Sequence, residues 1–240
     1  MPEGKDDALA KAPPPCLAAL GEAVNIIVGA EKKRFLIHKD IICHHSEYFR
    51  VAFNGEWKEA DDKDVVLEDV DAGMFGIFVS WLYTSKLPYG SDWLAAYRNC
   101  NKTSPVSNFG ILILNACVLG ERLLAQKFSQ EAHNYYIDLR SPSGYDEVIY
   151  AYKNLPEDSS ILQMMVDTQC TYWDRHDSKE DQSLHSQLPH KFLFDVMVRF
   201  SEVRDWIPAR YKKYRRETCE YHIHVTDEEH QNCPYNRFVL

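Results

Sequence analysis

Residues 24–53 read VNIIVGAEKKRFLIHKDIICHHSEYFRVAF, and this stretch decides the fold. The β-branched run Val24–Val28 ends at a glycine and predicts a buried strand. After a polar turn, Phe35–Ile37 predicts the second arm of a hairpin. Asp40 begins an apolar-rich helical stretch, and Ser46, a residue type that favours helix N-caps, divides it into two short helices. The stretch therefore predicts an α+β unit that begins with a hairpin.

The elements further along continue this pattern. Val65–Leu67 predicts another short strand, and the apolar spacing from Asp71 to Thr84 predicts a helix with a broad apolar face. Residues 85–108 contain Pro, Gly, Asn and Ser and predict a long, partly irregular connection. The remaining predicted helices span residues 109–124, 128–139, 145–154, 161–173 and 190–203. We therefore expect a small mixed sheet flanked by many helices.

The order of these elements and several short motifs resemble the BTB/POZ domain. The motifs are Phe35-Leu36-Ile37-His38-Lys39, Ser46-Glu47-Tyr48-Phe49, Gly55-Glu56-Trp57-Lys58-Glu59, Val65-Val66-Leu67-Glu68-Asp69-Val70-Asp71 and Trp81-Leu82-Tyr83-Thr84. The resemblance covers residues 22–140. It implies an α+β fold, a BTB/POZ-like small mixed sheet flanked by helices. One position departs from the family pattern, because Asn25 stands in a strand that often carries an Asp.

The rest of the chain suggests three further segments. Residues 145–207 resemble the all-helical extension of the BTB-only proteins of filamentous fungi. Residues 1–20 alternate Ala, Pro and charge without a period and predict a flexible N-terminal lead. Residues 208–240 form a basic tail that also carries Cys and His. The predicted organisation is therefore a lead, a BTB/POZ-like domain, a helical extension and a tail.

Composition limits the class of protein. Of the 240 residues, 45% are hydrophobic and 26% are charged, which excludes a wholly disordered or collagen-like chain. The net charge of −9 opposes general binding to nucleic-acid phosphates. The chain contains no apolar stretch of membrane-spanning length, and residues 1–16 lack the apolar core of a signal peptide. The seven cysteines are an odd number, and the five scattered ones, Cys16, Cys43, Cys100, Cys117 and Cys170, read as reduced thiols, so we expect an intracellular protein, cytoplasmic or nuclear.

The sequence contains none of the common catalytic motifs. It has no Gly-x-Ser-x-Gly, no phosphate-binding Gly-rich loop and no His-Glu-x-x-His. We therefore expect a non-catalytic protein–protein interaction module. The family resemblance implies either recruitment of substrates to a cullin ubiquitin-ligase scaffold or scaffolding of a transcriptional complex. Cullin-binding members often carry an apolar residue followed two positions later by Glu, whereas Ser85–Asp92 contains no Glu, and Asp92 is a weak substitute.

Apolar residues on more than one face of the paired helices suggest self-association through a two-fold patch. The predicted interaction surface consists of Ile41, Ile42, Tyr48, Phe49 and Phe53. The alternative is that these side chains pack on residues 85–108 or on the later helices. A homodimer is therefore an expectation with an open alternative.

The C-terminal tail contains residues of the types that bind zinc. No cofactor is established by a motif, but two thiols and two imidazoles make a tetrahedral zinc set, namely Cys219, His222, His224 and Cys233. In an extended segment His222 and His224 point to the same side, and His230 is a substitute ligand. The alternative is an ordinary surface cluster, because the spacing differs from that of a common zinc finger.

A basic run with interleaved tyrosines lies just before this set. Its cations are Arg210, Lys212, Lys213, Arg215 and Arg216. Such a run suits nucleic acid or a nuclear address, but it also suits a solvated helix face that offsets nearby acids. The rival to the interaction module is therefore a zinc-dependent nucleic-acid-binding or regulatory protein that acts through residues 210–233.

Overall fold

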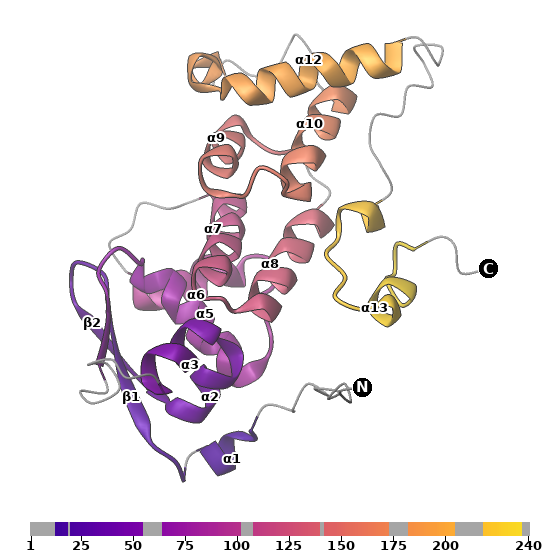
Figure 1. Ribbon diagram of the computed structural model, residues 1–240. Coiled ribbons are helices and arrows are strands. Elements are labelled where there is room, and N and C mark those ends of the chain that lie inside the picture. Colours follow the sequence, from indigo (N-terminus) through magenta and orange to yellow (C-terminus); the bar gives the residue numbers. More distant parts are fainter. Residues whose placement is uncertain are drawn as a thin grey trace, which may run out of the picture. The chain divides into compact units, whose positions relative to one another are not determined.

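The computed structural model describes residues 13–18, 20–54, 64–101, 108–139, 142–172, 182–204 and 218–236 (Figure 1). The chain forms two compact units. Unit 1 comprises Met1–Ser104 and Leu119–Lys127, and unit 2 comprises Pro105–Val118 and Phe128–Leu240. Among the described residues, none of the helices combines the length and the apolar character that a membrane crossing requires. The predicted domain boundaries remain predictions.

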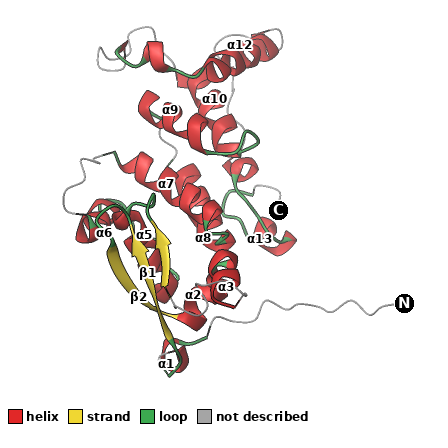
Figure 2. Cartoon of the chain, turned by 60° about the vertical axis from the view of Figure 1, so that its left-hand side comes forward, coloured by secondary structure: helices red, strands yellow, loops and turns green. Residues whose placement is uncertain are grey.

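Unit 1 contains the predicted mixed sheet. Its three strands lie in the order β2-β1-β3, with β1 antiparallel to β2 and parallel to β3 (Figure 2). The elements are α1 (Pro15–Ala18), β1 (Ala23–Val28), β2 (Lys33–His38), α2 (Lys39–His45), α3 (Glu47–Asn54), β3 (Asp64–Leu67), α5 (Ala72–Thr84) and α6 (Asp92–Cys100). The predicted hairpin, paired helices and third strand are all present, so the α+β prediction is confirmed.

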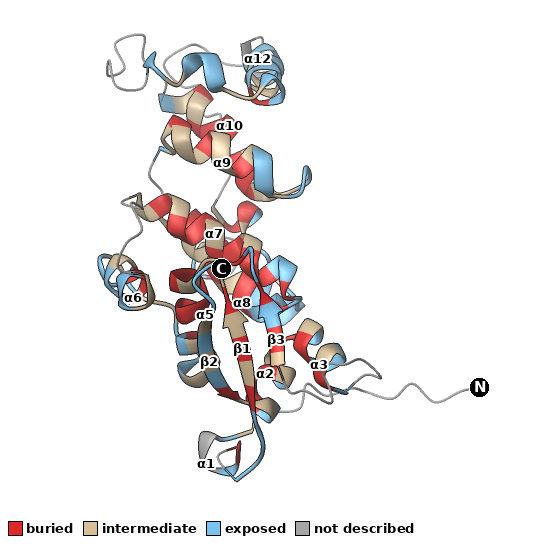
Figure 3. Cartoon of the chain, turned by 90° about the vertical axis from the view of Figure 1, so that its left-hand side faces the viewer, coloured by how far each residue is buried: buried red, intermediate tan, exposed pale blue. Residues whose placement is uncertain are grey.

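Alternate residues of the strands build the core of unit 1. Val24, Ile26 and Val28 of β1 are fully buried, while the residues between them are partly exposed. This period of two is what a sheet with one covered face requires. The helix α5 is buried over most of its length (Figure 3), and its Phe75 meets Phe35 of β2 edge to face at 5.0 Å. The apolar face of the sheet is therefore covered by α5.

Ser46 separates α2 from α3, as the sequence predicts. Its hydroxyl oxygen accepts a hydrogen bond from the backbone N–H of Phe49 at 3.3 Å, which is the N-cap interaction. The same hydroxyl donates to the carbonyl of Leu123 at 2.6 Å. Ser46 is buried, so both of these bonds form away from solvent and fix the corner between the two helices.

The prediction of a partly irregular connection over 85–108 is wrong for residues 92–100, which form the helix α6. Trp93 and Tyr97 are buried, one helical turn apart, and Cys100 continues the same face. This face packs against glycines of α5: a Cβ added at Gly73 would lie 2.7 Å from the Tyr97 ring, and one at Gly76 would lie 2.6 Å from the Cys100 sulfur. Gly73 and Gly76 have no side chains, so α6 can approach α5 closely and its large side chains can be buried.

Among the residues described, the regular elements of unit 2 are all helices, joined by loops. Its elements include α7 (Phe109–Arg122) and α8 (Gln126–Asp138), each of which has some residues in unit 1, followed by α9 (Tyr145–Asn154), α10 (Ser160–Tyr172), η1 (His185–Gln187), α12 (His190–Arg204), η3 (Thr218–Tyr221) and α13 (Asp227–Gln231). The helices predicted at 145–154, 161–173 and 190–203 are present within one residue at each end. The predicted helical remainder is confirmed.

Three predictions fall wholly or partly on residues that the structure does not describe. The lead at 1–20 has only residues 13–18 and 20 described, and of these Pro15–Ala18 form a helical turn. The Gly55–Glu59 motif lies outside the described residues. The five cations between 210 and 216 also lie outside them.

We predict that Gly73→Ala destabilises the protein, although alanine favours a helix by about 1 kcal/mol over glycine. The new methyl group would meet both the ring of Tyr97 and its backbone carbonyl oxygen, which is 2.8 Å away and cannot rotate aside. Overpacking of this kind costs about 1 to 3 kcal/mol. Urea unfolding measures the loss, and Ser80→Ala, at an exposed position of the same helix, is the control. A Gly73→Ala protein more stable than wild type would contradict this packing.

We also predict an acid-dependent loss of stability at His45. Burial, with the charges of His44 and Lys127, lowers the pKa of His45 from 6.5 to about 4. The unfolded chain therefore binds this proton at a higher pH than the folded chain, and the stability that depends on neutral His45 is lost as pH falls from 6.5 towards 4. Urea unfolding at several pH values should show a smaller acid loss in His45→Gln than in wild type. His190→Gln, at an exposed position away from His45, is the control, and equal pH profiles for wild type and His45→Gln would contradict the prediction.

Candidate functional site

Four of the five residues of the predicted interaction surface are buried in the structure. Ile41, Ile42, Phe49 and Phe53 are buried in unit 1, and Tyr48 is partly buried. Phe49 stacks on Phe53 and also meets Phe75 of α5 edge to face, with ring centres 6.1 and 6.4 Å apart. The prediction is wrong for the four buried residues, because α2 and α3 are short and the unit's own core covers their second apolar face.

The outer face of the sheet carries exposed apolar side chains instead. Leu36 of β2 is 69% exposed and Val66 of β3 is 52% exposed. Val66 aligns with Ile27 of β1, which is partly exposed. Asn25 aligns with both Leu36 and Asp64, and its amide donates to the Asp64 carboxylate at 2.9 Å. The neutral side chain of Asn25 thus joins the two neighbouring strands β1 and β3.

A second exposed apolar stripe lies on α12 in unit 2. Leu193, Phe194 and Met197 are between 47% and 61% exposed. On the opposite side of the helix, Phe192 is buried against the ring of Tyr152, with centres 5.5 Å apart. The helix therefore has one apolar side in the core and another in solvent.

A pocket of about 330 Å³ lies beside α12, and polar residues line much of it. Its Lys191 pairs with Asp195 at 2.9 Å, and its Arg199 pairs with Glu202 at 3.2 Å. Cation and acid thus neutralise each other along α12. These ion pairs, at three- and four-residue spacing, support the helix.

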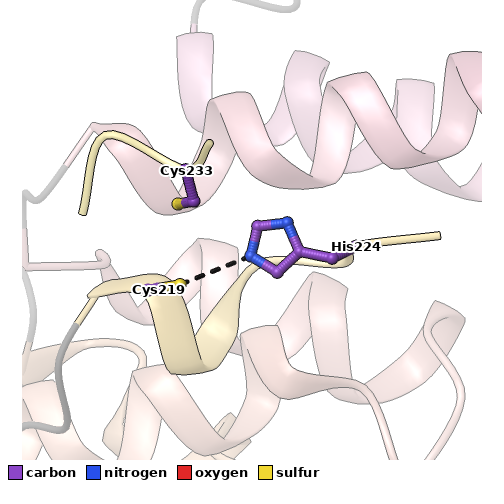
Figure 4. A group of neighbouring side chains, drawn as sticks. All are labelled: Cys219, His224 and Cys233. Carbon is purple, nitrogen blue, oxygen red and sulfur yellow. Dashed lines mark hydrogen bonds between the residues drawn. The ribbon is translucent and has the colours of Figure 1, made fainter. Parts of the chain in front are cut away.

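The strongest grouping of chemical side chains is the Cys/His cluster, which we define as Cys219, His222, His224 and Cys233. Ligand atoms of Cys219, His224 and Cys233 all lie within 4.8 Å of one another (Figure 4). The Cys219 sulfur is 3.5 Å from Nε2 of His224. The cluster assembles because η3 carries Cys219, the following loop carries both histidines, and the short helix α13 turns the chain back so that Cys233 meets them.

His222 joins the cluster from the side of α8. Its Nδ1 lies 3.4 Å from the Cys233 sulfur, and its Nε2 is 3.1 Å from Oδ1 of Asp138, the last residue of α8. Burial by itself would lower the pKa of His222, but the hydrogen bonds to Asp138 and Cys233 raise it overall. Asp138 was missed by the sequence analysis, because 84 residues separate it from His222 and no local pattern connects them.

The two thiols of the cluster differ in acidity. Burial, followed by the hydrogen bond to Cys233, raises the pKa of Cys219. Burial also acts to raise the pKa of Cys233, but hydrogen bonds with the Tyr235 backbone and with His222 lower it overall. The two shifts run in opposite directions, so Cys233 loses its proton at a lower pH than Cys219 does.

A polar stripe on α8 holds this segment in place. The amide of Asn134 donates to the Ile223 carbonyl at 3.0 Å and accepts from the Ile223 N–H at 2.9 Å. Gln130 also donates to Ile223, and Nε2 of His133 is 3.0 Å from the carbonyl of Tyr221. Both backbone groups of Ile223 are satisfied by side chains of one helix, so the loop that carries the two histidines has a defined position.

Asp167 of α10 anchors the segment from a second direction. Its carboxylate is fully buried and accepts from Tyr221 at 2.7 Å and from Arg199 of α12 at 2.6 Å. A buried carboxylate is tolerated only with such partners. Asp167 thereby joins α10, α12 and η3, and it was not singled out from the sequence, because a lone Asp inside a helix resembles any solvated acid.

Comparison with known proteins identifies the first part of the chain. Residues 17–100 match the family model described as "BTB/POZ domain". "Kelch-like protein 40b" of Danio rerio is 34% identical over 64 residues, which are 27% of this chain and 10% of the relative. "Kelch repeat and BTB domain-containing protein 12" of Danio rerio is 30% identical over 71 residues, 30% of this chain and 11% of the relative.

The matched segment spans about a tenth of the length of these curated relatives. The match confirms the BTB/POZ domain over residues 17–100 and, with it, the fold expected from the motifs. The resemblance of residues 145–207 to the fungal helical extension stays a prediction.

We predict that Asp167→Ala destabilises the protein by about 3 kcal/mol, because it leaves the partly buried Arg199 guanidinium and the buried Tyr221 hydroxyl without their acceptor. Chemical unfolding measures the loss. Asp158→Ala, at an exposed position, is the matched control and should change stability by less than about 0.5 kcal/mol. Equal stability of the two variants would show that the Asp167 contacts contribute nothing.

Proposed function

We propose that this protein is a non-catalytic protein–protein interaction module that self-associates and acts as an intracellular adaptor or scaffold, in the cytoplasm or the nucleus. The observation that carries the proposal is the BTB/POZ match over residues 17–100, together with the mixed sheet and the helices of that segment. The relatives that share this segment are named as Kelch-like and as Kelch repeat and BTB domain-containing proteins.

The outer sheet face of unit 1 is the proposed contact for a second copy. Leu36 and Val66 are each more than half exposed, and Ile27 lies between them on the central strand. An apolar face of this kind is stabilised when a partner removes it from water. A two-fold contact needs no other protein, since the same face on each copy covers the other.

The family resemblance implies two roles for the module, an adaptor on a cullin scaffold or a transcription-associated scaffold. The cullin role is the more specific of the two. The connection after α5 supplies no Glu, and Asp92 is its nearest acidic residue. Asp92 is exposed at the first position of α6. It is therefore accessible to a partner, and it is the residue through which we test cullin binding.

The experiment measures the mass of the purified chain by light scattering and identifies proteins that co-purify with it from cells. We expect a dimer for wild type and a monomer for Leu36→Asp/Val66→Asp, because two buried carboxylates would oppose the contact. Val225→Asp, at a position 63% exposed, is the control and should stay dimeric. Phe194→Asp/Met197→Asp tests in the same way whether the α12 stripe holds a partner.

Each result has a defined meaning. A cullin that co-purifies with wild type and is depleted in Asp92→Ala supports the ligase adaptor. Chromatin proteins in its place support the transcription-associated scaffold. A monomeric chain from which no protein co-purifies in stoichiometric amount contradicts the interaction module itself.

A further inference from the structure

We propose that unit 2 binds one structural Zn²⁺ ion through two thiolates and two imidazoles. The four ligands are the Cys/His cluster: Cys219 Sγ, His222 Nδ1, His224 Nε2 and Cys233 Sγ. The proposal is independent of the interaction module, because it concerns residues 218–236 and not the BTB/POZ segment.

The spacing of the ligand atoms fits a single ion. Zinc lies about 2.3 Å from a thiolate and about 2.0–2.1 Å from an imidazole nitrogen, so tetrahedral angles place sulfur and nitrogen ligands about 3.6 Å apart. Two of the four sulfur–nitrogen distances in the cluster are 3.5 Å, between Cys219 and His224, and 3.4 Å, between Cys233 and His222. Both distances are close to the separation expected for sulfur and nitrogen ligands of one zinc ion. His222 is not among the three residues whose ligand atoms all lie within 4.8 Å of one another, so its ring must shift to complete the set.

His222 is the fourth ligand rather than His230. The side chain of His222 is only 5% exposed, and its Nε2 is hydrogen-bonded to Asp138 while its Nδ1 faces Cys233. A metal-binding histidine is commonly oriented by a carboxylate on its other ring nitrogen. The ring of His230 lies 5.2 Å from that of His224, but His230 is exposed on α13, whereas Nδ1 of His222 already lies 3.4 Å from the Cys233 sulfur.

The set is complete with protein ligands, which is typical of a structural zinc site and leaves no open position for a substrate. Each thiol releases its proton to solvent as its sulfur binds the ion, so both cysteines become thiolates. The Tyr235 backbone already hydrogen-bonds Cys233, an interaction that stabilises an anionic sulfur.

The segment that would carry the ion has very little apolar core. Among residues 218–236, the buried ones are Cys219, Tyr221 and Cys233. Segments this small are commonly ordered by a metal or a disulfide. Zinc would close the chain from η3 to the turn after α13 and hold that loop against Asp138 of α8.

The test begins with the full-length chain, produced without a histidine tag in zinc-supplemented medium and dialysed against metal-free buffer. Elemental analysis should find one zinc ion per chain. A wild-type chain with less than a tenth of an ion overturns the proposal. If the same chain also shows two fewer free thiols than its seven cysteines provide, and non-reducing peptide mapping joins Cys219 to Cys233, these two residues form a disulfide instead.

Matched variants assign the ligands. We expect Cys219→Ser and Cys233→Ser to lose the zinc and Cys43→Ser, a thiol in α2, to keep it. His222→Gln should lose the ion and His230→Gln should retain it. Asp138→Asn should weaken zinc affinity about 10- to 100-fold, as expected for a group that orients a ligand. Full zinc content in both Cys219→Ser and Cys233→Ser would also overturn the proposal.

A measurement on the wild-type chain tests the zinc site even if the variants fail to fold. After zinc is removed with a chelator, the chain is titrated with Co²⁺ and its visible spectrum is recorded. Intense d–d bands with a sulfur-to-cobalt charge-transfer band are expected for a tetrahedral site with two thiolates, and added zinc should abolish both. Weak octahedral bands, or no binding, overturn the site.

Discussion

The central strand β1 is the constraint on which unit 1 depends. Its buried residues alternate with partly exposed ones, so a shift in register by one residue would turn Val24, Ile26 and Val28 away from the core. β2 reaches it through a tight turn in which Gly29 adopts a φ of 74°, whereas a parallel neighbour requires a longer crossover. The helices α2 and α3 lie between β2 and β3 in the chain and provide that crossover. The buried side chains of these two helices pack in the same core that lies against the sheet.

Unit 2 depends on polar contacts to a greater degree. Asp167 is a charged group without solvent exposure, and it is stabilised by Arg199 and Tyr221, which come from separate elements. The stripe on α8 binds the backbone of the C-terminal segment in a similar way. Hydrogen bonds of this kind define position, because a buried carboxylate or carbonyl that loses its partner is costly. A zinc ion in the Cys/His cluster would add a third fixed point to a segment with little apolar area.

The described secondary structure was largely predictable from the sequence. Strands with a period of two, an N-cap serine at position 46 and helices with long apolar stripes are local signals, and each appears where the pattern indicates. The helix α6 was not predicted, although Trp93 and Tyr97 have helical spacing, because the polar residues around them resemble a loop. Its stabilising contact is with glycines of α5, about twenty residues earlier in the chain, and no local pattern shows that contact.

By itself, the sequence determined the strand and helix order of the BTB/POZ segment and the residue types available for zinc. Only the tertiary structure decided which apolar residues are exposed. Phe49 and Phe53 lie in the core, whereas Leu36 and Val66 lie on the outer face. It also decided that His222 meets Asp138 and Cys233. The physical reason is that periodicity records which residues avoid water, while the partner that covers them, or the carboxylate that orients a histidine, comes from distant parts of the chain.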